Sequence, residues 1–171
     1  MKKYVFNRYS NKFSKIYKKE ESKLKKLLGD IEIEHVGSTA VPELGGKGII
    51  DIVIKTPKNK LNEFIKKLER MGYRHNLEHP GDDRRVFMQK IIRRSEKERR
   101  VHIHLTFDTG FYDSFISFRD YLRKNDKARE KYARIKKEAA KKCKEDGKAY
   151  RAHKDKFLNK ITKRALKIYK K

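Results

Sequence analysis

A glycine, two hydroxyl residues and a carboxylate lie close together in the sequence, in an order that suits phosphate chemistry. Gly37, Ser38 and Thr39 form a small-residue turn, and Asp51 follows after a short connection. Glycine lets the backbone approach a ligand closely, and hydroxyl groups and free backbone N–H groups at the start of a helix can hold a phosphate. We therefore predict that Gly37, Ser38 and Thr39 bind a nucleotide, although such a turn also caps ordinary helices.

Asp51 is the single charged residue in the β-branched run 49–54. A buried carboxylate is costly unless it is paired, hydrogen-bonded or bound to a metal. Its position after the Gly37-Ser38 turn predicts a metal ligand beside the phosphates. The alternative is a structural carboxylate that pairs with Lys47 or with backbone amides.

This order is similar to the layout of nucleotidyltransferases of the polymerase-beta type, where a Gly-Ser turn precedes a strand carrying Asp-hydrophobic-Asp/Glu. Carboxylates at i and i+2 share one face of a strand and can hold Mg²⁺. The metal then spans the triphosphate and stabilises charge during in-line attack at phosphorus. Here the i+2 position is Val53, which cannot bind a metal, so the usual pair is incomplete.

Other side chains could complete a metal site. His102 and His104 fall on one face of a predicted strand over 99–107, and Glu34 stands on the strand that enters the glycine turn. We predict Asp51, Glu34, His102 and His104 as ligands of a divalent metal, Mg²⁺ or Mn²⁺, with Zn²⁺ as an alternative because histidine favours the transition metals. The other reading is two half-exposed histidines on an outer strand.

Three cationic residues are candidates for phosphate contacts. Lys47 follows the turn and would offset phosphate charge, and Arg84 and Arg85 begin a predicted strand. We predict all three as nucleotide-binding residues. Because Asp82 and Asp83 stand next to the arginines, a salt-bridged loop is the alternative there.

The elements that must position these residues follow from hydrophobic periodicity. Alternating or β-branched patterns predict strands over 31–36, 49–54, 85–93 and 99–107, the last two forming a hairpin. Helical spacing predicts helices over 10–28, 58–71, 111–124, 126–146 and 148–169. This order predicts an α/β (α+β) fold: a mixed sheet with helices packed on one side and a C-terminal helical bundle. We expect a single domain, 1–171, whose C-terminal portion, 111–171, is helical.

The composition is strongly basic, with 48 Lys and Arg against 23 Asp and Glu and a formal net charge of +25. Such an excess attracts polyanions, so we expect a nucleotide as partner and nucleic acid as a further partner on the basic surface. The alternative is a solvated lysine-rich surface of the thermophile type. A single cysteine excludes an internal disulfide, and no apolar run approaches about 18 residues, so we expect a cytoplasmic protein without a membrane span.

Taken together, these motifs resemble the GrpB family, in the family's order and over nearly the whole chain. The resemblance rests on residues 34–42, Lys47, 50–52, 102–104, 118–123, Tyr132-Ala133, Lys136, Tyr150 and Lys154. It implies a nucleotidyltransferase-superfamily fold and a largely unassigned activity; a similar domain attached to dephospho-CoA kinase in some bacteria suggests nucleotide metabolism. The chain departs from the family in the connection, where Pro42-Glu43-Leu44 and Lys47-Gly48 stand in place of Pro-Gly-Leu and Lys-Pro.

From these residues we expect a metal-dependent, nucleotidyltransferase-like protein that binds a nucleoside triphosphate and transfers a nucleotidyl group to an unknown acceptor. Asp51, Glu34 and Ser38 would be its catalytic residues. The alternative is a catalytically degenerate module that binds a nucleotide or RNA in the same pocket and on the basic surface, as the loss of a carboxylate at Val53 favours. A basic, RNA-associated structural protein is a third reading and rests on charge alone.

Overall fold

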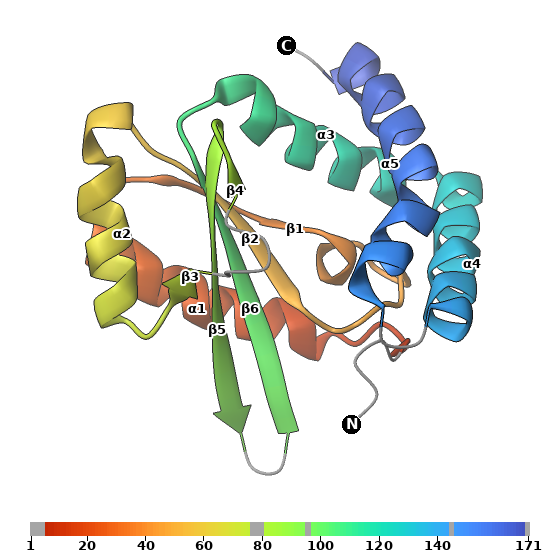
Figure 1. Cartoon of the computed structure of the whole chain (residues 1–171), viewed down its shortest axis with the longest axis horizontal. Helices are drawn as coiled ribbons and strands as arrows, with labels where there is room; N and C mark the ends of the chain where they lie inside the picture. Colours follow the sequence, from red (N-terminus) through yellow and green to blue (C-terminus); the bar gives the residue numbers. More distant parts are fainter. Residues whose placement is uncertain (1–5, 76–80, 95–96, 144–145, 170–171) are drawn as a thin grey trace.

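A mixed β-sheet forms the centre of the protein in the computed structural model, which describes residues 6–75, 81–94, 97–143 and 146–169 (Figure 1). Within these residues the sheet has six strands in the order β1-β2-β6-β5-β3, and β4 also pairs with β5. The strands are β1 (Glu32–Val36), β2 (Ile50–Lys55), β3 (Arg74–His75), β4 (Gly81–Asp82), β5 (Arg85–Arg94) and β6 (Lys97–Thr106). The four longer strands are those predicted from the sequence, with ends that differ by one or two residues.

The strand pairing brings the predicted site residues onto one face of the sheet. β2 runs parallel to β6 and antiparallel to β1. Asp51 pairs with His102, while Val53 lies between Glu34 and His104. Because successive side chains of a strand point to opposite faces, these five residues share a face.

Helices cover both faces of this sheet. On the face of Ile50, Ile52 and Ile54 pack α1 (Lys12–Leu28) and α2 (Leu61–Arg70), the second preceded by the 3-10 turn η2 (Lys58–Lys60). On the other face Tyr112 of α3 (Thr109–Lys124) packs against Val53. The mixed α/β fold is confirmed, with α1 and α2 packed on one side of the sheet and the C-terminal bundle reaching the other face through α3. β2 carries apolar residues on both of its faces, and both must be shielded from water.

The C-terminal helices form the predicted bundle with α3. α4 (Asp126–Lys142) and α5 (Gly147–Tyr169) lie beside each other at one end of the sheet (Figure 1). Their shared core includes Leu122, Tyr132 and Phe157, and the last two rings stack with centroids 5.3 Å apart. The predicted helix over 126–146 includes residues 144–145, which lie outside the described residues. Among the described helices none is long and apolar enough to cross a membrane.

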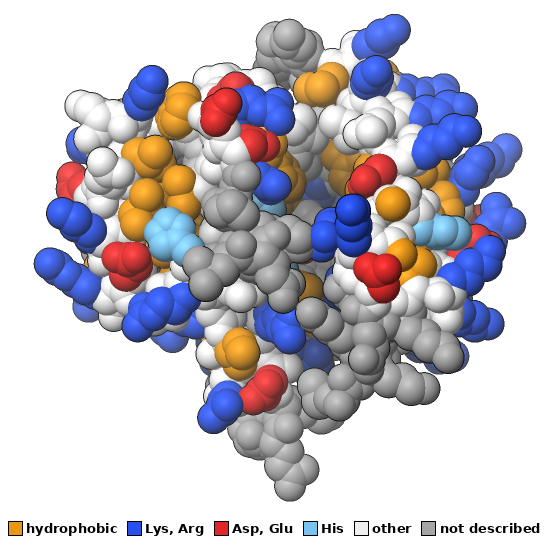
Figure 2. All heavy atoms as spheres, viewed as in Figure 1, with side chains coloured by type: hydrophobic (Ala, Val, Ile, Leu, Met, Phe, Trp, Pro, Cys, Tyr) orange, Lys and Arg blue, Asp and Glu red, His pale blue; other side chains and the backbone are white. Residues whose placement is uncertain are grey.

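The basic side chains are distributed rather than concentrated. Figure 2 shows lysine and arginine side chains on both halves of this face, over α2 and over α4 and α5, with others near its centre.

Candidate functional site

The turn after β1 can form only because residue 37 is glycine. Gly37 has a φ of 71°, in the left-handed region, and it precedes the 3-10 turn η1 (Ser38–Ala40). A Cβ atom on Gly37 would lie 2.4 Å from Oδ2 of Asp51. Any side chain at this position would therefore push the Asp51 carboxylate away from the turn.

Three hydrogen-bonding side chains hold the turn in place from inside the protein. The Thr39 hydroxyl donates to the Ile49 carbonyl (2.8 Å) and lies 3.0 Å from Nε2 of His35. Arg123 of α3 donates to the Ala40 carbonyl from Nε (2.9 Å) and Nη2 (2.8 Å). Thr39 is only 2% exposed. The Thr39 hydroxyl thus stabilises the turn, and Ser38 is the turn residue whose hydroxyl could contact a ligand.

His35 supports this arrangement as a neutral side chain. Burial lowers its pKa to about 4, and its ring stacks on Tyr17 with centroids 4.5 Å apart. Because the Thr39 hydroxyl donates to a carbonyl, it accepts a hydrogen bond from Nε2–H of His35. His35 is therefore a structural residue of the turn.

The Asp51 carboxylate is ionised at neutral pH. Its Oδ1 accepts a hydrogen bond from Nδ1 of His102 at 3.1 Å, and the side chain is 23% exposed. Burial alone would raise the pKa of Asp51, but the hydrogen bond and the charge of His102 lower it below its usual range. Two of the four predicted metal ligands, Asp51 and His102, thus contact each other. The second carboxylate oxygen of Asp51 remains for another partner.

The other two predicted ligands are held by arginines. Glu34 pairs with Nη1 of Arg119 at 2.6 Å, and Nδ1 of His104 accepts from Nη1 of Arg85 at 2.7 Å. Burial lowers the pKa of His104 to about 3, so its ring is neutral. In the described residues no group of three or more His, Cys, Asp or Glu side chains is arranged to hold a metal ion. Metal binding therefore remains a prediction that centres on Asp51.

Arg119 explains why Glu34 faces α3. It is almost fully buried, donates to the His35 carbonyl at 3.0 Å and pairs with Asp120 at 2.8 Å. Arg119 braces α3 against β1 through Glu34 and the His35 carbonyl, while its pair with Asp120 lies within α3. Glu34 is the strand's partner in that brace.

A cluster of three lysines surrounds the Asp51 side of the turn. Burial lowers the pKa of Lys47 and of Lys136 to about 7 and also lowers that of Lys154, while the charge of Asp51 opposes the shift in each of them. The Nζ atoms of Lys47 and Lys154 lie over the Tyr150 ring, 4.2 and 4.4 Å from its centroid. The three chain segments thus bring their cations to one carboxylate.

Lys136 is the most deeply placed member of this lysine cluster, at 3% exposure. Its Nζ donates to the Gly45 carbonyl and lies 4.6 Å from the Tyr132 ring centroid. A Cβ atom on Gly46 would lie 2.7 Å from Oγ of Ser38 and 3.5 Å from Nζ of Lys136. The Gly45-Gly46 loop therefore brings the Ser38 hydroxyl and the Lys136 ammonium to the same place.

Sequence reasoning found Lys47 but placed Lys136 and Lys154 only in the family resemblance, with no role at the turn. Both stand four residues after a tyrosine, Tyr132 and Tyr150 respectively. This spacing places the ammonium over the ring on one face of a helix. The repeated tyrosine–lysine spacing was the sequence signal that could have identified these lysines. Their position near the turn, however, depends on the packing of α4 and α5.

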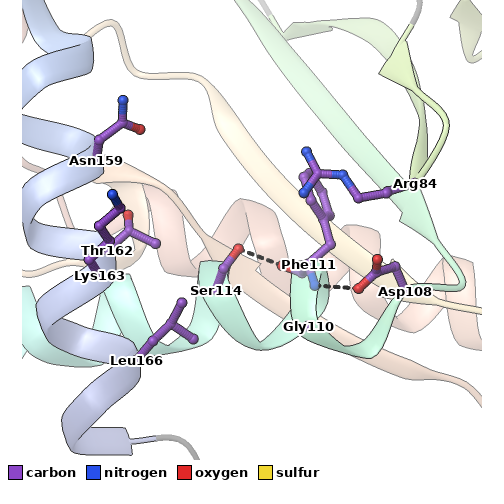
Figure 3. Close-up of a pocket in the computed structure, with 9 residues that line it drawn as sticks. All are labelled: Arg84, Asp108, Gly110, Phe111, Ser114, Asn159, Thr162, Lys163 and Leu166. Atoms are coloured by element: carbon purple, nitrogen blue, oxygen red, sulfur yellow. Dashed lines mark hydrogen bonds between the residues drawn. The ribbon is translucent and has the colours of Figure 1, made fainter.

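The two predicted phosphate-binding arginines lie away from the lysine cluster. Arg84 pairs with Asp82 at 3.4 Å and lies 5.1 Å over the Phe111 ring, while Arg85 binds His104. The salt-bridged loop considered as an alternative is thus present. Arg84 also lines a pocket of about 460 Å³ between α3 and α5 (Figure 3).

Comparison with known proteins gives consistent matches over the whole fold. A family model described as GrpB protein matches residues 4–164. The crystal structure of conserved protein GrpB from Enterococcus faecalis aligns with a TM-score of 0.80 and 30% identity, covering 98% of this chain and 100% of that one. A UPF0157 protein of Halalkalibacterium halodurans is 29% identical, over 92% of this chain and 80% of the relative. The polymerase core of TRAMP, an RNA surveillance complex, aligns with a TM-score of 0.48 and 19% identity, over 77% of this chain and 42% of that one, a likeness that carries no argument about activity.

Proposed function

This chain belongs to the GrpB family, and from the geometry around Asp51 we propose that it binds a nucleoside triphosphate. The phosphates would lie between the Gly37-Ser38 turn and the lysine cluster. The observation that carries the proposal is the convergence of three lysines from separate segments, Lys136 buried and the other two half-buried, on one carboxylate beside a glycine turn.

Charge balance favours a polyanionic ligand. Cations withdrawn from water are costly unless negative charge compensates them. Among the described residues, the Asp51 carboxylate acts on all three lysines, and Asp155 acts on Lys154 as well. The neighbouring carboxylate of Glu34 is paired with Arg119. A triphosphate would add negative charge beside the lysines and accept hydrogen bonds from their ammonium groups.

A divalent metal fits this site as a companion of the phosphates. Mg²⁺ commonly binds through one or two carboxylates together with substrate phosphates, so a single Asp51 oxygen is a sufficient protein ligand. Zn²⁺ fits less well, because His104 is held by Arg85 and Nδ1 of His102 is turned to Asp51. When bound, Mg²⁺ or Mn²⁺ would neutralise phosphate charge.

The environment of Val53 favours binding over transfer. Val53 is 0% exposed and packs with Val36 and Tyr112 under α3. The position that carries a second carboxylate in polymerase-beta-type enzymes is therefore part of the core here. A metal-dependent nucleotidyl transfer to an unknown acceptor is the second candidate function, favoured by the glycine turn beside Asp51.

Calorimetric titration with ATP plus Mg²⁺ or Mn²⁺ tests the proposal. We expect wild-type protein to bind, Asp51→Asn to abolish the metal-dependent part of binding, and Lys136→Met to weaken binding roughly 10- to 100-fold, the contribution of a hydrogen bond to a charged group. Lys160→Met is the matched control, because it removes an exposed lysine of α5 away from the cluster. Wild-type protein that binds no nucleoside triphosphate with either metal would overturn the proposal. Release of pyrophosphate from ATP on addition of RNA would support the transfer candidate.

A further inference from the structure

A second site lies in the pocket between α3 and α5, where ring, cation and amide side chains converge. Its two walls face each other in Figure 3, with Arg84, Phe111 and Ser114 on one side and Asn159, Thr162 and Lys163 of α5 on the other. We propose that this pocket binds one nucleotide unit of a single-stranded polynucleotide.

Arg84 and Phe111 form a stacking platform. The guanidinium of Arg84 lies 5.1 Å from the Phe111 ring centroid, and the Arg84 side chain is 58% exposed. Unpaired bases stack on aromatic rings and on arginine planes, an interaction tolerant of sequence. The ion pair of Arg84 with Asp82 is exposed, and such pairs contribute little, so a phosphate can share the guanidinium.

The opposite wall supplies hydrogen-bonding groups and a second cation. Asn159 and Lys163 are exposed on α5, and Thr162 is half-buried. An amide offers both donors and an acceptor to a base edge, and an ammonium suits a phosphodiester. Asp108 also lines the pocket, but its Oδ1 accepts from the Phe111 backbone N–H at 2.8 Å as the cap of α3. The pocket thus matches a base and its phosphate together.

A continuous row of ring contacts leads from this pocket to Asp51. Neighbouring centroids in the row are 5.1, 4.7, 5.0 and 4.9 Å apart, and the last ring donates to Asp51. The rings in order are Phe111, Phe115, His104, Phe87 and His102. Phe87 and His104 are buried, so this row links the pocket to Asp51 through the interior of the protein. Only the role of a bound strand as an acceptor rests on the proposed function; its binding in the pocket does not.

The charge of the molecule favours a polynucleotide over a protein segment. The net charge is +25, and the pocket pairs cations with one ring instead of presenting a broad apolar patch.

Fluorescence titration of a short single-stranded oligonucleotide carrying 2-aminopurine tests the inference, with RNA and DNA strands compared. We expect quenching by wild-type protein, and Phe111→Leu should weaken binding about 5- to 100-fold, the measured range for loss of one stacked base. Phe111→Tyr retains a ring and should keep the quenching. Lys163→Gln should reduce the slope of log affinity against log salt by about 0.7, and the neighbouring Lys160→Gln by less.

Two results would overturn the inference: unchanged binding by Phe111→Leu that melts like wild type, or equal slope changes for Lys163→Gln and Lys160→Gln. Displacement of the oligonucleotide by an acidic peptide but not by a second oligonucleotide would also overturn it. The ATP titration separates this inference from the proposed function. Phe111→Leu should bind ATP as wild type does, and oligonucleotide binding without ATP binding would leave the pocket in place while removing the triphosphate site.

Discussion

The lysines around Asp51 are held near the midpoint of their titration at neutral pH. The pKa of Lys47 and of Lys136 is lowered to about 7, first by burial and then by the charge of Lys154. Each is therefore about half charged near pH 7, and its protonation state depends on what lies beside it. A phosphate placed among these lysines would favour their charged forms and raise their pKa values.

Nucleotide binding should therefore take up protons. At pH 8 the free protein has Lys47 and Lys136 mostly neutral, and a bound triphosphate would protonate them. Affinity for ATP should fall as pH rises from about 7 to about 9, because protonation must then accompany binding. Calorimetry at pH 8 in two buffers of different ionisation enthalpy measures the uptake. Identical binding heats in both buffers would contradict proton uptake. Lys136→Met should take up fewer protons on binding ATP than wild-type protein does.

The glycine turn offers a residue-scale test with an internal control. Gly37→Ala must place its Cβ 2.4 Å from Oδ2 of Asp51, while Gly29, with a φ of 85°, has no atom within 4 Å of such a Cβ. Both changes put alanine at a left-handed backbone conformation, which costs roughly 1–2 kcal/mol. We expect Gly29→Ala to lower only the melting temperature and Gly37→Ala to lose ATP binding as well. Equal ATP affinity in the two variants would show that the Asp51 position is unimportant.

At the scale of elements, one face of β2 carries both a candidate site residue, Asp51, and a core residue, Val53. Asp51 faces the glycine turn, whereas Val53, two residues later, is covered by α3. Restoring the usual carboxylate pair with Val53→Asp should therefore not create a metal site. It should lower the free energy of unfolding by about 3 kcal/mol or more, because the new charge is buried without a partner.

Chemical denaturation at two pH values checks this reason for the loss. Val53→Asp should recover stability as pH falls and the new carboxyl is protonated, while Val53→Ala, which loses packing only, should not. A stable Val53→Asp protein that binds Mn²⁺ more tightly than wild type would contradict the assignment of Val53 to the core.

Each face of the sheet also holds a buried neutral histidine, His35 toward α1 and His104 toward α3. Their pKa values, about 4 and about 3, lie below that of an unfolded histidine, because burial disfavours the charged ring. Between about pH 6.5 and pH 4.5 the unfolded chain binds more protons than the folded protein. The free energy of unfolding should therefore decrease as pH is lowered, by up to about 1.4 kcal/mol per pH unit for each histidine. Urea denaturation of His104→Gln should show a shallower dependence; equal slopes would contradict the buried neutral ring.

Local patterns predicted the elements well, but not what only tertiary packing decides. The strand around Asp51 was predictable because β-branched residues and a glycine turn are adjacent in sequence. The contacts of each face of β2 could not be assigned from the sequence, since Ile52 and Val53 stand in one apolar run. Lys136 and Lys154 were missed as site residues because two helices far along the chain must pack to bring them to the turn. Likewise, only the folded structure shows that Glu34 forms an ion pair with Arg119 of α3.

At the scale of the whole molecule, the net charge is +25, and on the face in Figure 2 lysine and arginine side chains are spread over both halves. Long-range attraction of polyanions then comes from the whole surface, while selectivity comes from the few side chains that contact the ligand. Binding of a single strand should consequently weaken steeply with salt through release of counterions, for RNA and DNA alike.

Filter binding from about 50 to about 200 mM salt measures this dependence, over which contacts to several phosphates lower affinity by orders of magnitude. Phe111→Leu should lower the affinity equally at every salt concentration and leave the slope of log affinity against log salt unchanged, because stacking releases no counterions. Removing an exposed lysine such as Lys160 should change the slope slightly and should change the affinity little at high salt. Weak binding that is flat across the series would instead assign the charge to solvation of the surface, and the pocket between α3 and α5 would then have no strand to hold.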